Sequence, residues 1–114
     1  RRTDLMGDDV LSQLAATIRA RRAESAETSY TSKLLDAGAE TCARKFGEEA
    51  VEAVIAGIAQ SPQSLKAEAA DVLYHLLVLL EARGVAWDDV LGELERRSGV
   101  SGLAEKAARA QRQG

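Results

Sequence analysis

Two long segments with helical periodicity meet at the only proline of the chain, Pro62. Apolar residues recur at helical spacing from Ala39 to the turn at Gln60, and again from an expected N-cap at Ser64 to Arg83. Proline lacks a backbone N–H and clashes with the preceding turn, so one straight helix does not continue through this point. The sequence therefore predicts two long helices that pack antiparallel as a hairpin.

Shorter helices are expected on both sides of this hairpin. They cover about residues 8–22, residues 30–37, a segment that begins at Trp87, and residues 103–109. Thr28 or Ser29 is a suitable N-cap for the second of these helices. Gly38 and Gly84 stand where a left-handed residue commonly ends a helix, so both are predicted to terminate helices.

The composition of the chain limits both its fold and its partners. Only 4% of the residues are aromatic and 46% are hydrophobic, which favours helices around one core over a twisted sheet. We expect an all-α bundle of about four to five helices in a single domain over residues 1–114, with a core of about residues 8–109. The formal net charge of −3 gives no support to a nucleic-acid partner and leaves a small molecule as the expected one.

Cysteine and histidine each occur once, as Cys42 and His75. A single cysteine forms no disulfide within the chain, so a reducing, cytoplasmic location is expected, and the pair does not suffice for a zinc site of the usual Cys/His type. The longest apolar run, residues 76–80, is far shorter than the roughly 20 residues that a membrane span needs. No membrane partner is expected.

One predicted helix is apolar around most of its circumference. Between Val72 and Leu80, every residue except Tyr74 and His75 is valine or leucine. A helix of this kind has to be buried on all sides, whereas a small bundle covers it on one side only. We therefore expect a homodimer, in which residues of both chains complete each site.

Carboxylates gather on the two long helices. Glu48, Glu49 and Glu52 fall within an arc of roughly 100° on the first helix, and Glu68 and Asp71 lie roughly 60° apart on the second. Both sets border the apolar stripes, so antiparallel packing brings them face to face, where their mutual repulsion requires a cation. Carboxylate oxygens favour Mg²⁺ or Mn²⁺, and Mg²⁺ also accepts phosphate oxygens and activates water.

Three other interpretations of these acids are open. A solvated acidic face is the usual meaning of clustered glutamates on a helix. A non-catalytic helical dimerisation module needs only the leucine-rich helix and binds no Mg²⁺. A carboxylate-bridged di-iron bundle requires Glu-x-x-His on two helices. The sequence argues against this last class, because His75 is the only histidine and Val72 stands three residues before it.

Two segments resemble the paired EExxE and ExxD motifs of the all-α nucleoside triphosphate pyrophosphohydrolase superfamily. They are residues 45–52, Lys-Phe-Gly-Glu-Glu-Ala-Val-Glu, and residues 68–75, Glu-Ala-Ala-Asp-Val-Leu-Tyr-His. Two further segments narrow the similarity to one family within this superfamily. They are residues 29–35, Ser-Tyr-Thr-Ser-Lys-Leu-Leu, and residues 101–107, Ser-Gly-Leu-Ala-Glu-Lys-Ala. Over about residues 8–109 the chain resembles the phosphoribosyl-ATP pyrophosphohydrolase family.

The resemblance implies Mg²⁺-dependent hydrolysis of phosphoribosyl-ATP between its α and β phosphates. The products are phosphoribosyl-AMP and pyrophosphate, in the second step of histidine biosynthesis, and the implied assembly is a homodimer of the stand-alone form. The implied catalytic and metal-binding residues are Glu48, Glu49, Glu52, Glu68 and Asp71. A pyrophosphohydrolase for other nucleoside triphosphates is the nearest alternative, because the acidic motifs are shared across the superfamily.

Basic residues near these motifs are candidates for phosphate contacts. Lys45 projects onto the same arc as Glu49, so we expect it to meet a phosphate oxygen or to pair with Glu49. Lys33, ahead of the acids, is a second candidate for a phosphate contact. Simple surface positions are expected for Arg96, Arg97 and Lys106. His75 lies one turn after Asp71, and a hydrogen bond to a neighbour is the expected role of its ring.

Overall fold

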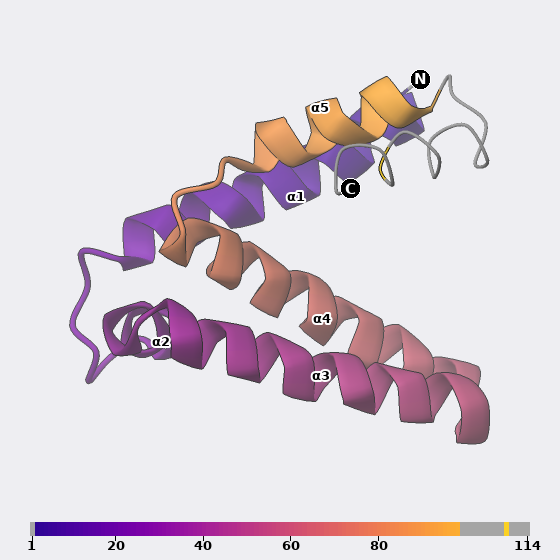
Figure 1. Cartoon of the computed structure of the whole chain (residues 1–114), viewed down its shortest axis with the longest axis horizontal. Helices are drawn as coiled ribbons and strands as arrows, with labels where there is room; N and C mark the ends of the chain where they lie inside the picture. Colours follow the sequence, from indigo (N-terminus) through magenta and orange to yellow (C-terminus); the bar gives the residue numbers. More distant parts are fainter. Residues whose placement is uncertain (1, 99–108, 110–114) are drawn as a thin grey trace.

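The computed structural model describes residues 2–98 and residue 109, with side chains from residue 10 onward. These residues form five α-helices and contain no strand, which confirms the all-α fold class. The helices are α1 (Arg2–Arg21), α2 (Tyr30–Ala37), α3 (Ala39–Ala59), α4 (Pro62–Ala82) and α5 (Trp87–Arg97), as Figure 1 shows. The helix predicted for residues 103–109 lies outside the described residues, except for Arg109.

Two predicted helix starts are wrong. The first helix was expected to begin near residue 8, but α1 already runs from Arg2, because acidic residues are tolerated inside a helix as well as at its start. α4 begins at Pro62, not after an N-cap at Ser64. The hydroxyl of Ser61 accepts the backbone N–H of Ser64 at 3.1 Å, and the first position of a helix does not need the N–H that proline lacks.

The other helix ends follow the residues that the sequence indicates. Ser29 caps α2, since its side chain accepts the backbone N–H of Ser32 at 3.1 Å. Gly38, at a φ of 101°, separates α2 from α3, and Gly84, at a φ of 71°, follows the end of α4. Both angles lie in the region that side chains with a Cβ rarely adopt, so both glycines confirm their predicted role.

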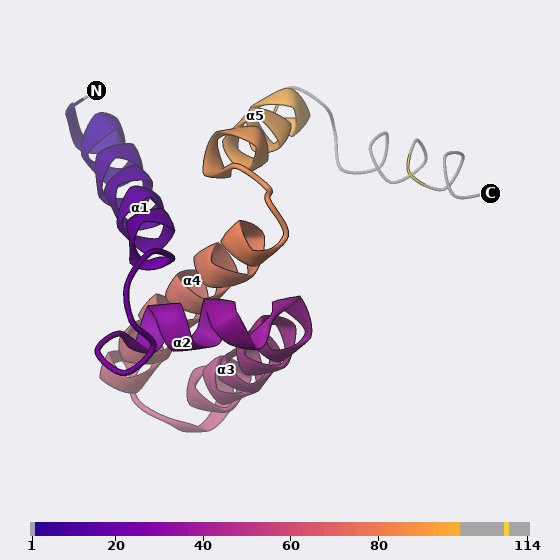
Figure 2. The same cartoon turned by 90° about the vertical axis from the view of Figure 1, so that its left-hand side faces the viewer.

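The hairpin of α3 and α4 is the most extensive helix pairing in the described chain, and the two helices run antiparallel as predicted. α2 packs on both of them at the end away from the Pro62 turn. α1 packs against α4, and α5 lies alongside α1. In Figure 2, α1 and α5 extend away from the part formed by α2, α3 and α4. No described helix has the combination of length and apolar character needed to cross a membrane.

The core of the described chain is small. Its buried residues lie where the first four helices meet, and they are Ile18, Leu34, Leu35, Cys42, Leu77 and Val78. By contrast, α3 exposes a row of aliphatic side chains: Val51, Val54, Ile55 and Ile58, of which Ile58 is 82% exposed. On α4, Leu73 is 40% exposed. A single chain therefore does not bury α4 on all sides.

Candidate metal-binding active site

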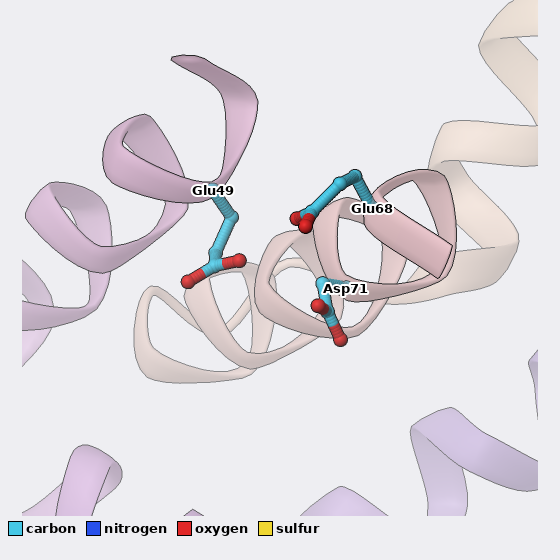
Figure 3. Close-up of side chains that lie close together, drawn as sticks. All are labelled: Glu49, Glu68 and Asp71. Atoms are coloured by element: carbon cyan, nitrogen blue, oxygen red, sulfur yellow. The ribbon is translucent and has the colours of Figure 1, made fainter. Parts of the chain in front are cut away.

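Three carboxylates from the two long helices converge on one point. Glu49 on α3 and Glu68 and Asp71 on α4 each offer an oxygen, and the three oxygens lie within 4.8 Å of one another. Figure 3 shows the side chain of Glu49 directed toward α4, where Glu68 and Asp71 lie on adjacent turns. The antiparallel pairing of α3 and α4 creates this arrangement, because it sets the fourth turn of α3 against the second and third turns of α4.

Glu68 is the acid of the group whose surroundings most disfavour its charged form. Burial raises the pKa of its carboxyl, and the charges of Glu52, Asp71 and Glu49 raise it further. Its Oε1 is buried and accepts no hydrogen bond from the described residues. A buried, unpartnered carboxylate oxygen among like charges is costly unless a cation binds it. Glu52 raises the pKa of Glu68 through its charge and through a side-chain hydrogen bond, so Glu52 lies beside the cluster.

Glu48 lies in a different environment from the other glutamates of its motif. Arg44 donates to its Oε2 at 3.0 Å, and Lys45 lies 3.2 Å from its Oε1. The hydrogen bonds from Lys45 and Arg44 lower the pKa of the Glu48 carboxyl. Glu48 is thus already neutralised by its own helix. The structure brings together three of the five predicted ligands, sets Glu52 beside them, and pairs Glu48 with cations.

The basic candidates also differ in position. Lys45 pairs with Glu48 and not with Glu49, and this hydrogen bond is the main reason that the pKa of Lys45 is raised. Lys33 is exposed on α2, and no ion pair among the described residues includes it. On α5, Arg96 and Arg97 both pair with Glu93, at 2.6 Å and 2.9 Å. Lys106 lies outside the described residues.

His75 is held by its neighbours next to Asp71, although only one of its ring nitrogens has a partner. Its Nδ1 lies 3.0 Å from the backbone oxygen of Asp71. A carbonyl oxygen only accepts, so Nδ1 carries the proton and donates it. The buried Nε2 has no partner among the described residues. The expected hydrogen bond is present, but it gives a partner to only one of the two ring nitrogens, Nδ1.

Sequence reasoning missed the aromatic contacts around His75. The ring of Tyr74 meets it at a centroid distance of 4.9 Å and an angle of 87°, and the ring of Tyr30 at 6.3 Å and 77°. The hydroxyl of Tyr74 is hydrogen-bonded to that of Thr31, which ties α4 to α2. Tyr30 and His75 are 45 positions apart in the chain, so no local spacing indicated their contact.

Comparison with known proteins gives a consistent result. A model of the family described as phosphoribosyl-ATP pyrophosphohydrolase matches residues 11–98, a range that contains all five acids. A phosphoribosyl-ATP pyrophosphatase of Rhodobacter capsulatus is 60% identical over 99 residues, or 87% of this chain and 96% of that protein. One from Dinoroseobacter shibae is 58% identical over 100 residues, or 88% of this chain and 98% of its own. The resemblance drawn from the motifs is confirmed.

Proposed function

Because the chain belongs to the phosphoribosyl-ATP pyrophosphohydrolase family, we propose that it hydrolyses phosphoribosyl-ATP in a Mg²⁺-dependent reaction. The reaction breaks the bond between the α and β phosphates and adds one water, which yields phosphoribosyl-AMP and pyrophosphate in histidine biosynthesis. The observation that carries the metal dependence is the convergence of three carboxylate oxygens within 4.8 Å. No basic residue from the described chain neutralises Glu68.

The residues fit a hard divalent cation. Glu49, Glu68 and Asp71 offer oxygen ligands from two rigid helices, and Glu52 stands beside them. A bound cation gives the buried Oε1 of Glu68 a partner. It also stabilises the charged carboxylate, which lowers the raised pKa of this group. When bound, Mg²⁺ supplies a positive charge for phosphate oxygens and lowers the pKa of a coordinated water. The same donors accept Mn²⁺.

The side chains of this chain contribute to binding and orientation. Lys45 is held in its charged form one turn before Glu49, so it is placed to bind a phosphate oxygen once it leaves Glu48. Surface ion pairs contribute little stability, so exchanging Glu48 for a phosphate costs little. The hydrogen bond of His75 to the backbone of Asp71 fixes the helix turn that carries this ligand. The role of Glu48 as a ligand stays a prediction.

The protein is proposed to act as a homodimer in the cytoplasm. Val51, Val54, Ile55 and Ile58 form one apolar face on α3, and Leu73 is exposed on α4. Contiguous exposed aliphatic side chains of this kind are typical of an interface. The radius of gyration of 16.3 Å exceeds the roughly 13 Å expected for a compact chain of this length, which is consistent with a protomer that a partner completes. Sedimentation of an Ile58→Glu variant as a monomer supports this dimer, and dimerisation equal to that of the parent contradicts it.

The decisive experiment compares substrates and metal. The pure protein is incubated with phosphoribosyl-ATP, ATP or dATP, with and without Mg²⁺, and pyrophosphate is measured. We expect release from phosphoribosyl-ATP with Mg²⁺ and little release in every other mixture. Equal turnover of ATP or dATP contradicts the substrate and favours a general nucleoside triphosphate pyrophosphohydrolase. Equal turnover after removal of all divalent cations contradicts the metal site.

A further inference from the structure

A row of functional groups runs along the seam between α3 and α4. Going toward α2, the row passes Glu52, Glu49 and Lys45 on α3, and Glu68, Asp71 and His75 on α4. The antiparallel hairpin produces this order, because one helix is followed backward while the other is followed forward. From Glu68 to His75 the row advances by seven residue steps along the helix, about 10 Å along the axis. Carboxylates lie at one end of the row, and the ammonium group of Lys45 lies at the other.

Tyr30 closes the α2 end of this row. Its ring contacts the ring of His75 at a centroid distance of 6.3 Å. The interaction of Tyr30 with Lys45 is the second cause, after the hydrogen bond with Glu48, that raises the pKa of Lys45, so Tyr30 lies within electrostatic range of that lysine. Tyr30 therefore lies at the α2 end of the row, in contact with its last residue on α4.

Tyr30 is exposed although the residues beside it in the chain are buried. It is 52% exposed, whereas the other three aromatic residues of the chain, Phe46, Tyr74 and Trp87, are each partly buried. Its neighbours in the chain, Ser29 and Thr31, are buried, and Ser29 caps α2. Exposure of the ring is therefore not the result of a frayed helix end. An aromatic face held open to solvent beside a charged site is suited to a flat ligand.

His75 fixes the orientation of this face. Its ring is held by the hydrogen bond of Nδ1 to Asp71 and by the edge contact with Tyr74. Only 7% of His75 is exposed, so its ring is a firm support for Tyr30. The contact between Tyr30 and His75 is nearly perpendicular, at 77°, and it leaves about half of the tyrosine surface open.

We propose that Tyr30 stacks on the purine ring of the nucleotide, while the carboxylates hold the distal phosphates through a cation and Lys45 binds the phosphate between them. This inference rests on the proposed function and names the group that recognises the base. The order of the row matches the order of groups in a nucleoside triphosphate. Metal-bound phosphates lie at one end, a further phosphate beside the lysine, and the nucleoside at the tyrosine.

The test separates stacking from the tyrosine hydroxyl. Tyr30→Leu removes the aromatic face, and we expect KM for phosphoribosyl-ATP to rise about tenfold with kcat changed less than about twofold. Tyr30→Phe keeps the face and should retain the parental KM. Both variants should keep the helicity and melting temperature of the parent. An unchanged KM in Tyr30→Leu, or an equal rise in Tyr30→Phe, overturns the proposal.

Binding measurements keep this test independent of catalysis. Phosphoribosyl-AMP retains the purine but lacks the pyrophosphate, so calorimetry without Mg²⁺ should show about tenfold weaker binding to Tyr30→Leu and parental binding to Asp71→Asn. Inhibition by pyrophosphate with Mg²⁺ should be the same in Tyr30→Leu and the parent. Weakened pyrophosphate inhibition, or no binding of phosphoribosyl-AMP to the parent, overturns the stacking. If the parent binds the product as expected but hydrolyses no phosphoribosyl-ATP, the proposed function fails and the stacking stands.

Discussion

Glu93 on α5 and Glu68 on α4 are the same residue type in opposite surroundings. Arg96 and Arg97 both donate to Glu93, and they lower the pKa of its carboxyl to about 2. Glu68 has no cationic partner among the described residues, and its pKa is raised by burial and by neighbouring acids. The chain thus neutralises one glutamate with its own arginines, whereas the described residues offer the other no cation.

The largest expected effect is on activity, and it separates the acids of the cluster around Glu68 from Glu93. Asp71→Asn or Glu49→Gln removes a ligand oxygen from the cluster, and we expect pyrophosphate release to fall at least about 100-fold at saturating Mg²⁺ and substrate. The metal-free variants should be as stable as the metal-free parent or slightly more so, because like-charge repulsion is removed.

Glu93→Gln is the matched control, since it neutralises a glutamate that already has internal partners. It should keep near-parental turnover. Near-normal turnover in both Asp71→Asn and Glu49→Gln would remove the carboxylate cluster from the mechanism.

The next effect is on thermal stability. Mg²⁺ that binds the folded cluster selectively should raise the melting temperature by about 5 °C when its concentration is tenfold above the dissociation constant. Calorimetry of the parent and of Glu68→Gln checks this, and the variant should respond less. A melting temperature that does not change at millimolar Mg²⁺ in the parent contradicts a preformed site.

A smaller effect is expected in the pH dependence of stability without metal. The pKa of Glu68 is raised in the folded state, so the folded chain binds its proton more tightly. The free energy of unfolding should therefore fall as pH rises above the unfolded value of 4.5. Glu93 acts in the opposite direction, and its stabilisation is lost as pH falls from 4.5 toward 2.

Denaturant titrations of Glu68→Gln and Glu93→Gln separate these two contributions. The first variant should lose the decline above pH 4.5, and the second should lose part of the decline below it. Identical pH profiles for the parent and Glu68→Gln would show that the acidic cluster is fully solvated.

The smallest expected effect concerns Glu48, which resembles Glu93 in its partners while it stands in the motif of Glu49. Arg44 and Lys45 already pair with it, so Glu48→Gln should reduce turnover less than about tenfold. Parallel kinetics of Glu48→Gln and Glu52→Gln provide the measurement. A loss in Glu48→Gln as large as that in Glu49→Gln would show that Glu48 leaves its ion pairs and binds metal, as the sequence motif implies.

Much of the fold was predictable from local residues. Apolar periodicity indicated the two long helices, and the special backbone angles of Gly38 and Gly84 appeared where the sequence placed helix ends. The errors are also local. The cap expected at Ser64 is wrong because Pro62 itself occupies the first position of α4, where the missing N–H is not needed, so Ser61 is the N-cap.

The candidate site was predictable only in part. The spacing set Glu49, Glu68 and Asp71 on helix faces that meet, and the motifs correctly indicated the family. Spacing did not distinguish Glu48 from Glu49, because adjacent residues on a helix point only about 100° apart and either can border a seam. Packing decided between them: Glu49 faces α4, while Glu48 faces the basic residues of its own helix.

The sequence by itself determined the helical class, the antiparallel hairpin and the gathering of acids along it, because periodicity and helix-breaking residues act over a few positions. Only the tertiary structure decided which three oxygens meet, which glutamate has no cationic partner among the described residues, and that Tyr30 reaches His75. These properties depend on distances between helices far apart in the chain, and on burial, which changes the free energy of a charge only when the surrounding helices are in place.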